Sequence, residues 1–301
     1  MPDPVAAALG LVASWAGRPI THTRIKGGLS HYIARVETDE GDRWLLRVLD
    51  PKIAATGLGL PLDQEIANTL VAADTGVGAR VLHELPGALI LEYIDGVTLD
   101  APAVRARISQ VAKACKALHA GPRFANDFSI FRKYDGFVAL CREHDLTVPD
   151  GFHDWAGTVH AIEQTLAKRH ITDVPCHNDL LPENFIEAQG RVRIVDYQLS
   201  GNNDPCFELG DIAAEASFDP DDVERLTRAY FGTHDEALIA RVRLNVIMSN
   251  LTWTLWFVVH HGLVAQQRDF DYNAEAATKF AKATGDLTDP GFGALMEAAG
   301  R

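Results

Sequence analysis

The stretch CHNDLLPEN, residues 176–184, followed by IVDY, residues 194–197, decides how this chain is interpreted. Asn184 lies five positions after Asp179, and Asp196 lies seventeen positions after it. Phosphoryl transfer from a nucleotide requires a carboxylate that orients the attacking hydroxyl and accepts its proton, together with oxygen ligands for Mg²⁺. We therefore expect Asp179 to act as the base, and Asn184 and Asp196 to bind the metal. A polar turn explains a lone His-x-Asp, but not the added Asn and Asp at this spacing.

Upstream of this stretch, the pattern is that of a small antiparallel sheet. Short runs rich in Ile, Val, Leu and aromatic residues predict strands, and Glu40-Gly41-Asp42 predicts a hairpin turn between two of them. One segment with helical spacing interrupts the strands, and Gly76 and Gly78 end it. The expected strands are residues 24–28, 31–38, 44–49, 80–84 and 88–94, and the expected helix is residues 63–73.

Beyond residue 96 the pattern becomes mainly helical. Apolar residues at 104, 108, 111, 115 and 118 recur at steps of four and three, which predicts one long amphipathic helix from about Asp100 to Gly121. Strands at 184–187 and 192–196 flank a turn, and helices follow from about Phe207. The fold class is α+β with two lobes: an antiparallel β-sheet lobe with one helix, residues 1–95, and a larger helical lobe, residues 96–301, joined by a hinge near residues 94–97.

The overall composition excludes several classes of protein. With 47% hydrophobic and 23% charged residues, the 301-residue chain is globular rather than disordered or collagen-like. A net charge of -13 without a basic stripe argues against nucleic acid as a partner. The apolar stretches are shorter than the roughly 18–20 residues of a spanning helix, so we expect no membrane insertion. No secretory signal is evident, and four scattered cysteines favour free thiols in a reducing cytoplasm.

These motifs resemble the small-molecule kinases of the choline kinase and aminoglycoside phosphotransferase group, which share the protein-kinase-like fold. The matching features run from about Ile25 to His260. The resemblance implies that ATP with Mg²⁺ lies between the two lobes and that the acceptor binds on the helical side. It also implies that His177 braces the catalytic loop and that Asp211, in FELGD, supports it from below by accepting backbone hydrogen bonds.

The nucleotide-binding residues are carried over from the same resemblance. IKGGLSH, residues 25–31, resembles the glycine-containing turn over the phosphates, which places Gly28 and Ser30 there. Arg47 stands where protein kinases carry a phosphate-binding lysine, and Glu65 on the following helix is its expected partner. In LEYIDG, residues 91–96, backbone groups of two residues would bind the adenine edge: Glu92 and Ile94.

The acceptor pocket is predicted from a pair of indoles. Trp253 and Trp256 lie three residues apart on one helical face, as in choline kinases, and aromatic faces attract quaternary ammonium groups. Glu215 matches an acidic residue that could neutralise the cation. Two positions depart from the choline kinase pattern, because Gln198 lacks a charge and Leu199 lacks an aromatic ring. A buried core position is the alternative explanation for the tryptophans.

The predicted function is transfer of the ATP γ-phosphoryl group to the hydroxyl of a small cationic alcohol, choline first. Ethanolamine, thiamine and an aminoglycoside are the alternative acceptors. A pseudokinase that binds nucleotide and acts through protein interaction is a further alternative, which the intact set of Asp179, Asn184 and Asp196 disfavours.

Overall fold

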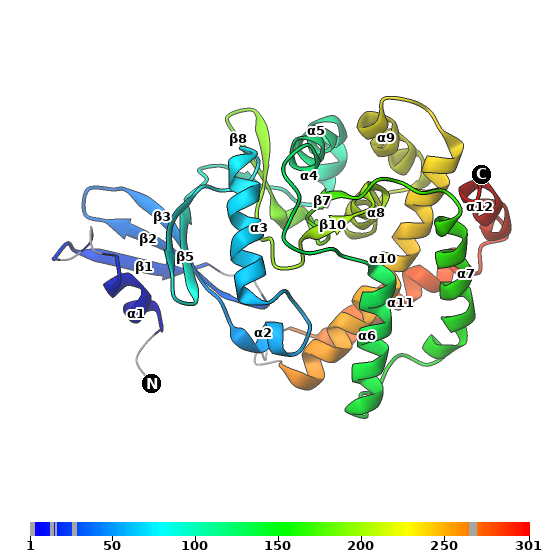
Figure 1. Ribbon diagram of the computed structural model, residues 1–301, viewed down its shortest axis with the longest axis horizontal. Coiled ribbons are helices and arrows are strands. Elements are labelled where there is room, and N and C mark those ends of the chain that lie inside the picture. The colour runs from blue at the N-terminus through cyan, green and yellow to red at the C-terminus, as the bar shows by residue number, and fades with distance from the viewer. Residues whose placement is uncertain (1–3, 13–14, 16, 26–28, 265–269) are drawn as a thin grey trace.

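The N-terminal part of the protein is built on an antiparallel sheet. The computed structural model describes residues 4–12, 15, 17–25, 29–264 and 270–301. The five strands are arranged in the order β1-β2-β3-β5-β4, and Figure 1 shows helix α3 standing between this sheet and the C-terminal helices. The strands are β1 (Ile20–Arg24), β2 (Tyr32–Thr38), β3 (Arg43–Val48), β4 (Val81–Leu85) and β5 (Ala88–Glu92), and the helices are α1 (Pro4–Gly10), α2 (Pro51–Ala55) and α3 (Leu62–Asp74). Two short helices, α1 and α2, thus accompany the expected one.

The first strand does not lie where the sequence pattern places it. A strand is predicted over residues 24–28, but β1 covers Ile20–Arg24 and pairs with β2 from Ile20 opposite Thr38 to Arg24 opposite Ala34. Residues 26–28 lie outside the described part of the chain. Only Ile20 of β1 is partly buried. An exposed edge strand has no buried face and therefore no alternation of apolar residues that the sequence could reveal.

The two faces of the sheet are covered by different apolar clusters. Helix α1 packs Val5 and Ala8 against one face, which also contributes Val36 and Leu46. The other face packs residues of β5 against the start of β4 and against Ile66 of α3. Because β5 is buried on both faces, its sequence is a continuous apolar run, as expected for a central strand.

The C-terminal part is mainly helical. Strands β6, β8 and β9 form one small sheet, β7 pairs with β10, and helix α10 runs through the middle of the surrounding helices (Figure 1). The strands are β6 (Val97–Thr98), β7 (Val174–Cys176), β8 (Phe185–Ala188), β9 (Arg191–Ile194) and β10 (Gly201–Asn203). The helices are α4 (Ala101–Ala106), α5 (Ile108–His119), α6 (Ile130–Glu143), α7 (Ala156–Ala167), α8 (Pro205–Glu215), α9 (Pro220–Phe231), α10 (Glu236–Leu263), α11 (Tyr272–Leu287) and α12 (Phe292–Ala299), with 3-10 turns at Phe152–Trp155 and Pro182–Asn184.

Helix α10 is the core helix of this part. By length and composition it is apolar enough to cross a membrane, but 83% of its most apolar window is buried inside the protein. It packs against α6, α8, α11 and α12. Its apolar character is therefore explained by the neighbouring helices, which cover it on several sides.

Aspartates mark the starts of several helices. The side chains of Asp100, Asp204, Asp219, Asp235 and Asp271 each accept a hydrogen bond from a backbone amide in the first turn of the helix that follows. This satisfies amide groups that have no intrahelical partner. The start of α8, which carries several residues of the site described below, is set in this way.

The prediction of one long helix after residue 100 is wrong in one respect, because the structure has two helices there, α4 and α5. At Arg107 the backbone leaves the α conformation, with φ -116° and ψ 24°, and its amide closes a tighter turn on the Val104 carbonyl. The Arg107 guanidinium pairs with Glu187 on β8 at 2.7 Å. Apolar spacing continues across the break, since α4 and α5 pack against the same core, so the pattern alone did not reveal it.

Helix α3 is fastened to the helical part of the protein. Asn68 is fully buried, and its side-chain amide donates to Asn126 Oδ1 at 2.8 Å and to Ser200 Oγ at 3.0 Å. Its oxygen accepts from the amide of Ala125 at 2.9 Å. Because these bonds leave no buried polar atom of Asn68 unpaired, they hold α3, with Glu65 one turn earlier, at a defined position over the cleft.

Candidate active site

The hairpin after β7 brings the three predicted phosphoryl-transfer residues together. Asp179 follows β7, Asn184 ends the 3-10 turn, and Asp196 follows β9. The side-chain amide of Asn184 donates to the Asp179 carbonyl at 2.8 Å, and the Val195 amide donates to the Asn184 carbonyl at 3.0 Å. The short strands β8 and β9 thus return the chain so that Asp196 lies beside the catalytic loop.

A line of alternating charges connects this hairpin to the N-terminal sheet. The Arg47 guanidinium, on β3, lies 2.5 Å from Asp196 Oδ1 and 2.9 Å from Glu65 Oε1. The Arg47–Glu65 ion pair predicted from the sequence is therefore present. Glu65 also lies 3.2 Å from His31 Nε2, while His31 Nδ1 accepts from the Asp50 amide at 3.0 Å. Since Nδ1 accepts, Nε2 carries the proton and donates to Glu65.

Asp196 and Asp179 have opposite electrostatic environments. Burial alone would raise the pKa of Asp196, but the positive charge of Arg47 and its hydrogen bond bring the pKa below its ordinary value. The pKa of Asp179 is raised well above its ordinary value, first by burial and then by the negative charges of Asp211 and Asp196. Asp196 is therefore a stable anion, whereas the Asp179 carboxylate holds a proton strongly.

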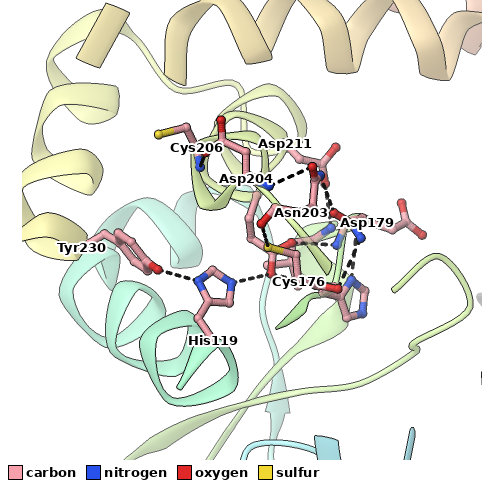
Figure 2. A network of polar contacts seen from close by, with 12 residues as sticks. His119, Cys176, Asp179, Asn203, Asp204, Cys206, Asp211 and Tyr230 are labelled. Atoms are coloured by element: carbon pink, nitrogen blue, oxygen red, sulfur yellow. Dashed lines mark hydrogen bonds and ion pairs between the residues drawn. The ribbon is translucent and has the colours of Figure 1, made fainter. Parts of the chain in front are cut away.

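The catalytic loop rests on a buried carboxylate. Glu208, on α8, accepts hydrogen bonds from the backbone amides of His177 at 2.9 Å and Asn178 at 2.7 Å. His119 Nε2 lies 3.1 Å from the same carboxylate, and His119 Nδ1 lies 2.7 Å from the Tyr230 hydroxyl (Figure 2). Burial would raise the pKa of Glu208, but the hydrogen bond and charge of His119 lower it below its ordinary value. This carboxylate is thus a charged anchor under the loop.

Asn178 holds the loop in a strained backbone conformation. Its φ of 66° is in the left-handed region, which costs energy for a residue other than glycine. The side-chain amide of Asn178 donates to the carbonyls of Leu199 and Gly201 at 3.2 and 3.3 Å, and its oxygen accepts from Asn203 at 2.9 Å. These bonds offset the strain and fix the direction in which the chain enters Asp179.

His177 and Asp211 make the contacts expected of supporting residues. His177 Nε2 lies 2.9 Å from the Val195 carbonyl, and its Nδ1 accepts from the Asp179 amide at 3.2 Å. Asp211 accepts from the Leu180 amide at 2.7 Å, from Ser249 Oγ at 2.8 Å and from the Trp253 indole at 2.7 Å. Both residues therefore bind backbone groups next to Asp179.

The sequence analysis did not identify Glu208, His119 or Asn178 as site residues. A signal was present for the first of them, because Glu208, Asp211 and Glu215 are spaced by three and four positions and so lie on one face of an otherwise apolar helix. Acidic residues at that spacing in a buried helix need partners. No comparable pattern marks His119, whose partner lies 89 residues away along the chain.

The predicted acceptor residues are already engaged with other parts of the protein. Glu215 forms a buried ion pair with Lys279 of α11. The Trp256 indole donates to the Leu58 carbonyl at 3.1 Å, and its ring stacks on His260 at a centroid distance of 4.7 Å. Both tryptophans are buried, with 4% and 8% of their surface exposed. Both contribute to the core, and Trp253 also contacts Asp211, which supports the loop at Asp179.

The structure describes the predicted nucleotide-binding residues less completely than the residues of the hairpin. Gly28 lies outside the described residues. Ser30 is buried, and its hydroxyl has no hydrogen-bond partner in the part of the chain that the structure describes. The Glu92 amide donates to the Arg80 carbonyl at 2.8 Å, while Ile94 packs against the cluster between β5 and α3. The Glu92 amide is therefore used within the sheet, and adenine binding at the hinge stays a prediction.

The donor set at the hairpin fits a magnesium ion. Asp196 offers a carboxylate, and the Asn184 amide nitrogen donates to the Asp179 carbonyl, so its oxygen is the atom that could coordinate a cation. The pKa of Asp196 is low, which keeps it in the anionic form that a metal ligand requires. Carboxylate, amide oxygen and phosphate oxygens are the ligands that Mg²⁺ prefers.

Comparison with known proteins is consistent with this geometry. The protein LicA of Haemophilus influenzae is 29% identical over 166 residues, and the match covers 52% of this chain and 62% of that protein. Ethanolamine kinase 2 of Mus musculus is 25% identical over 291 residues, which cover 85% of this chain and 74% of that protein. This chain therefore spans less than two thirds of the LicA relative.

A solved structure shares the whole fold. The choline/ethanolamine kinase family protein from Mesorhizobium loti is 28% identical, has a TM-score of 0.83, and the match covers 98% of each chain. The sequence profile of the phosphotransferase enzyme family (APH) matches residues 21–243, which includes the sheet, the catalytic hairpin and α8. The chain therefore belongs to the phosphotransferase enzyme family.

Proposed function

We propose that this protein is a kinase that transfers the γ-phosphoryl group of ATP to the hydroxyl of a small amino alcohol of the choline or ethanolamine type. The observation that carries the proposal is the convergence of Asp179, Asn184 and Asp196 on one hairpin, with Arg47 of the opposite lobe paired to Asp196. A basic carboxylate, two oxygen ligands and a fixed cation are the groups that this reaction requires.

In the proposed reaction, the acceptor oxygen attacks the γ-phosphorus atom while the bond from that phosphorus to the β,γ-bridging oxygen breaks. The hydroxyl proton passes to Asp179, and ADP leaves with the electron pair of the broken bond. The high proton affinity of buried Asp179 suits this acceptance of a proton. Arg47 would bind phosphate oxygens from the side of the sheet. Mg²⁺, held by Asn184 and Asp196, would neutralise phosphate charge when bound.

The nucleotide is proposed to lie between the sheet and the catalytic hairpin. Gly28 and Ser30 would cover the phosphates, with Glu65 holding Arg47 in place. The backbone of Glu92 and Ile94 would meet the adenine edge, through the Glu92 carbonyl rather than its amide. The unpartnered hydroxyl of buried Ser30 supports this assignment, since a buried donor without a partner is costly unless a ligand satisfies it.

The acceptor is proposed to bind beside α8 and α10, with Glu215, Trp253 and Trp256 as its contacts. Carboxylates cluster near Glu215 and Trp253, since the charges of Asp211, Asp196 and Glu215 add to burial in raising the pKa of Asp179. Such a site favours a positively charged acceptor. The names of the ethanolamine kinase and choline/ethanolamine kinase relatives support the same class. We place the protein in the cytoplasm, where its four buried thiols would stay reduced.

The test is a turnover assay with ATP and Mg²⁺ against choline, ethanolamine, thiamine and an aminoglycoside. Formation of ADP should depend on choline or ethanolamine and should disappear when EDTA removes the metal. ADP formation with only thiamine or only the aminoglycoside would contradict the acceptor class but not the kinase. Nucleotide binding without any acceptor-dependent turnover would favour the pseudokinase.

A further inference from the structure

The acceptor side of the cleft contains a lysine that the sequence analysis did not include. Lys279 lies on α11, and its ammonium group forms an ion pair with Glu215 at the end of α8. Both side chains are about 8% exposed, so the pair is buried. Glu215 follows Asp211 by one helical turn, and Asp211 binds the Leu180 amide next to Asp179. Lys279 therefore lies at the acceptor side of the candidate base.

The charges around Asp179 indicate the electrostatic role of Lys279 beside Glu215. Asp179 and three carboxylates that act on its pKa lie close together, and among the described residues the cations paired with them are Arg47, on Asp196, and Lys279, on Glu215. Lys279 also opposes the raised pKa of Asp179, which burial and the neighbouring carboxylates cause. The ammonium of Lys279 thus supplies the positive charge that a cationic acceptor would bring to this position. The carboxylates are Asp179, Asp196, Asp211 and Glu215.

Lys279 is held by fewer hydrogen bonds than Arg241, another buried cation in the described part of the chain. Among the residues that the structure describes, Glu215 is the one hydrogen-bond acceptor of its ammonium group, which has three donors. Arg241, by comparison, binds Asp204 and also donates to the carbonyls of Leu166 and Arg169. A lysine ammonium on a flexible four-carbon stem can move to water, where it is strongly hydrated.

We infer that Lys279 is a displaceable internal cation, which occupies the ammonium position of the acceptor pocket until a positively charged acceptor replaces it on Glu215. This inference rests on the proposed function. Replacement of one cation by another keeps the buried Glu215 carboxylate paired throughout, whereas departure of Lys279 without replacement would leave an uncompensated buried charge. A neutral alcohol of the same shape cannot take over this pairing, so the pocket selects for a cationic alcohol.

Displacement can be observed directly in the unmodified protein. An amine-acylating reagent should modify Lys279 slowly in the free protein and about tenfold faster with saturating choline, because the ammonium group then lies in water. Lys113, which is exposed on α5, is the internal control and should react at the same rate in both cases. Peptide mass spectrometry measures both residues in one sample. An unchanged rate at Lys279 with choline bound would overturn the inference.

A variant gives the second test. Lys279→Met should lower the choline KM about tenfold if Lys279 leaves Glu215 in about a tenth of the free molecules, since apparent affinity falls with the competent fraction. The ATP KM should stay the same, and Lys113→Met should change neither value. A melting temperature close to that of the wild type shows that the variant is folded. A choline KM that is unchanged or higher would show that Lys279 is a permanent partner or a binding group.

The failure of this inference differs from the failure of the proposed function. Tetramethylammonium has no hydroxyl and cannot be phosphorylated, but it should also speed acylation of Lys279. Turnover of choline with no response of Lys279 to either cation would refute the displacement and leave the kinase intact. No turnover of any amino alcohol, together with no response to tetramethylammonium, would refute both.

Discussion

The proposed phosphate side of the site, around Arg47 and Asp179, and its proposed acceptor side, around Glu215, are built differently. On the phosphate side, Arg47 binds two carboxylates from different elements, and backbone amides on both sides of Asp179 are held by Glu208 and Asp211. On the acceptor side, Glu215 has a single cationic partner from α11. The tryptophans there donate their indole protons to groups of the protein.

The phosphate side is therefore preorganised, whereas on the acceptor side we infer that the cation paired with Glu215 can be exchanged. Phosphoryl transfer gains most from groups fixed in advance, because little reorganisation then accompanies the reaction. Selection of an acceptor gains from a charge that can be exchanged between a side chain and a ligand. We therefore expect substitutions on the phosphate side to reduce kcat or to weaken nucleotide binding, and substitutions on the acceptor side to change the acceptor KM.

The largest effect is expected from Asp179→Asn. The kcat should fall by about 10²–10⁴-fold, the contribution of a positioned general base, while nucleotide binding stays nearly unchanged. Steady-state kinetics and nucleotide titration measure the two quantities. Near-normal turnover would remove Asp179 from the chemical step. As a comparison, Asp196→Ala should weaken binding of the magnesium–nucleotide complex as well as turnover.

The same substitution has a predicted effect on stability. The pKa of Asp179 is higher in the folded protein than in the unfolded chain, so folding favours the protonated carboxyl group. The contribution of this group to stability is lost as pH rises through the folded-state pKa. Asp179→Asn has no such loss, so without ligands it should melt about 2 °C or more above the wild type at pH 7. The difference should shrink toward pH 4. Asp196→Asn, with a lowered pKa, should show the opposite sign at pH 7.

Glu208→Gln tests whether the anchor under the catalytic loop affects the rate. The amide has one accepting oxygen and cannot receive the His177 and Asn178 amides together with His119, so the loop should shift. We expect kcat to fall by about 10²-fold with the nucleotide KM changed less than threefold. Tyr230→Phe, which removes a contact of His119 alone, should cost much less. An equal kcat in Glu208→Gln and wild type would make Glu208 a purely structural residue.

Arg47→Ala should have a smaller effect, on nucleotide binding. The nucleotide KM should rise by about tenfold, and more than the acceptor KM, since a fixed cation binds phosphate oxygens and not the alcohol. Arg47→Lys should recover part of the loss, because it keeps the charge without the bidentate geometry. If neither substitution changed the nucleotide KM, Arg47 would serve only the ion pairs with Glu65 and Asp196.

The smallest effect is expected from Trp256→Phe. This change keeps an aromatic face but removes the hydrogen bond to the Leu58 carbonyl, at a cost of about 1 kcal/mol in the free energy of unfolding. The choline KM should change less than threefold. Trp256→Ala should raise the choline KM about tenfold if the ring contacts the cation. A large melting shift with an unaltered choline KM would assign this tryptophan to the core alone.

The sequence by itself predicted that Asp179, Asn184 and Asp196 lie close together. Asp179, Asn184 and Asp196 lie within one hairpin, so their spacing along the chain nearly determines their arrangement in space. The period of apolar residues likewise predicted strands β2 to β5, helix α3 and the β8–β9 hairpin. It did not predict α1, α2, α6 or α7, it misplaced the exposed edge strand β1, and it did not reveal the break at Arg107. The periodicity of apolar residues in a strand or helix follows from the local backbone geometry and from the burial of one face of that element.

Only the tertiary structure decided which distant residues neutralise the buried charges. Glu208 meets His119, Glu215 meets Lys279, and the Trp256 indole reaches Leu58 across 198 residues. A buried carboxylate must find a partner, but the sequence does not say which of the protein's cations will lie beside it. That choice follows from the packing of α5, α8, α10 and α11, which is determined by shape over the whole core. For this reason the sequence predicts the reaction better than it predicts the acceptor.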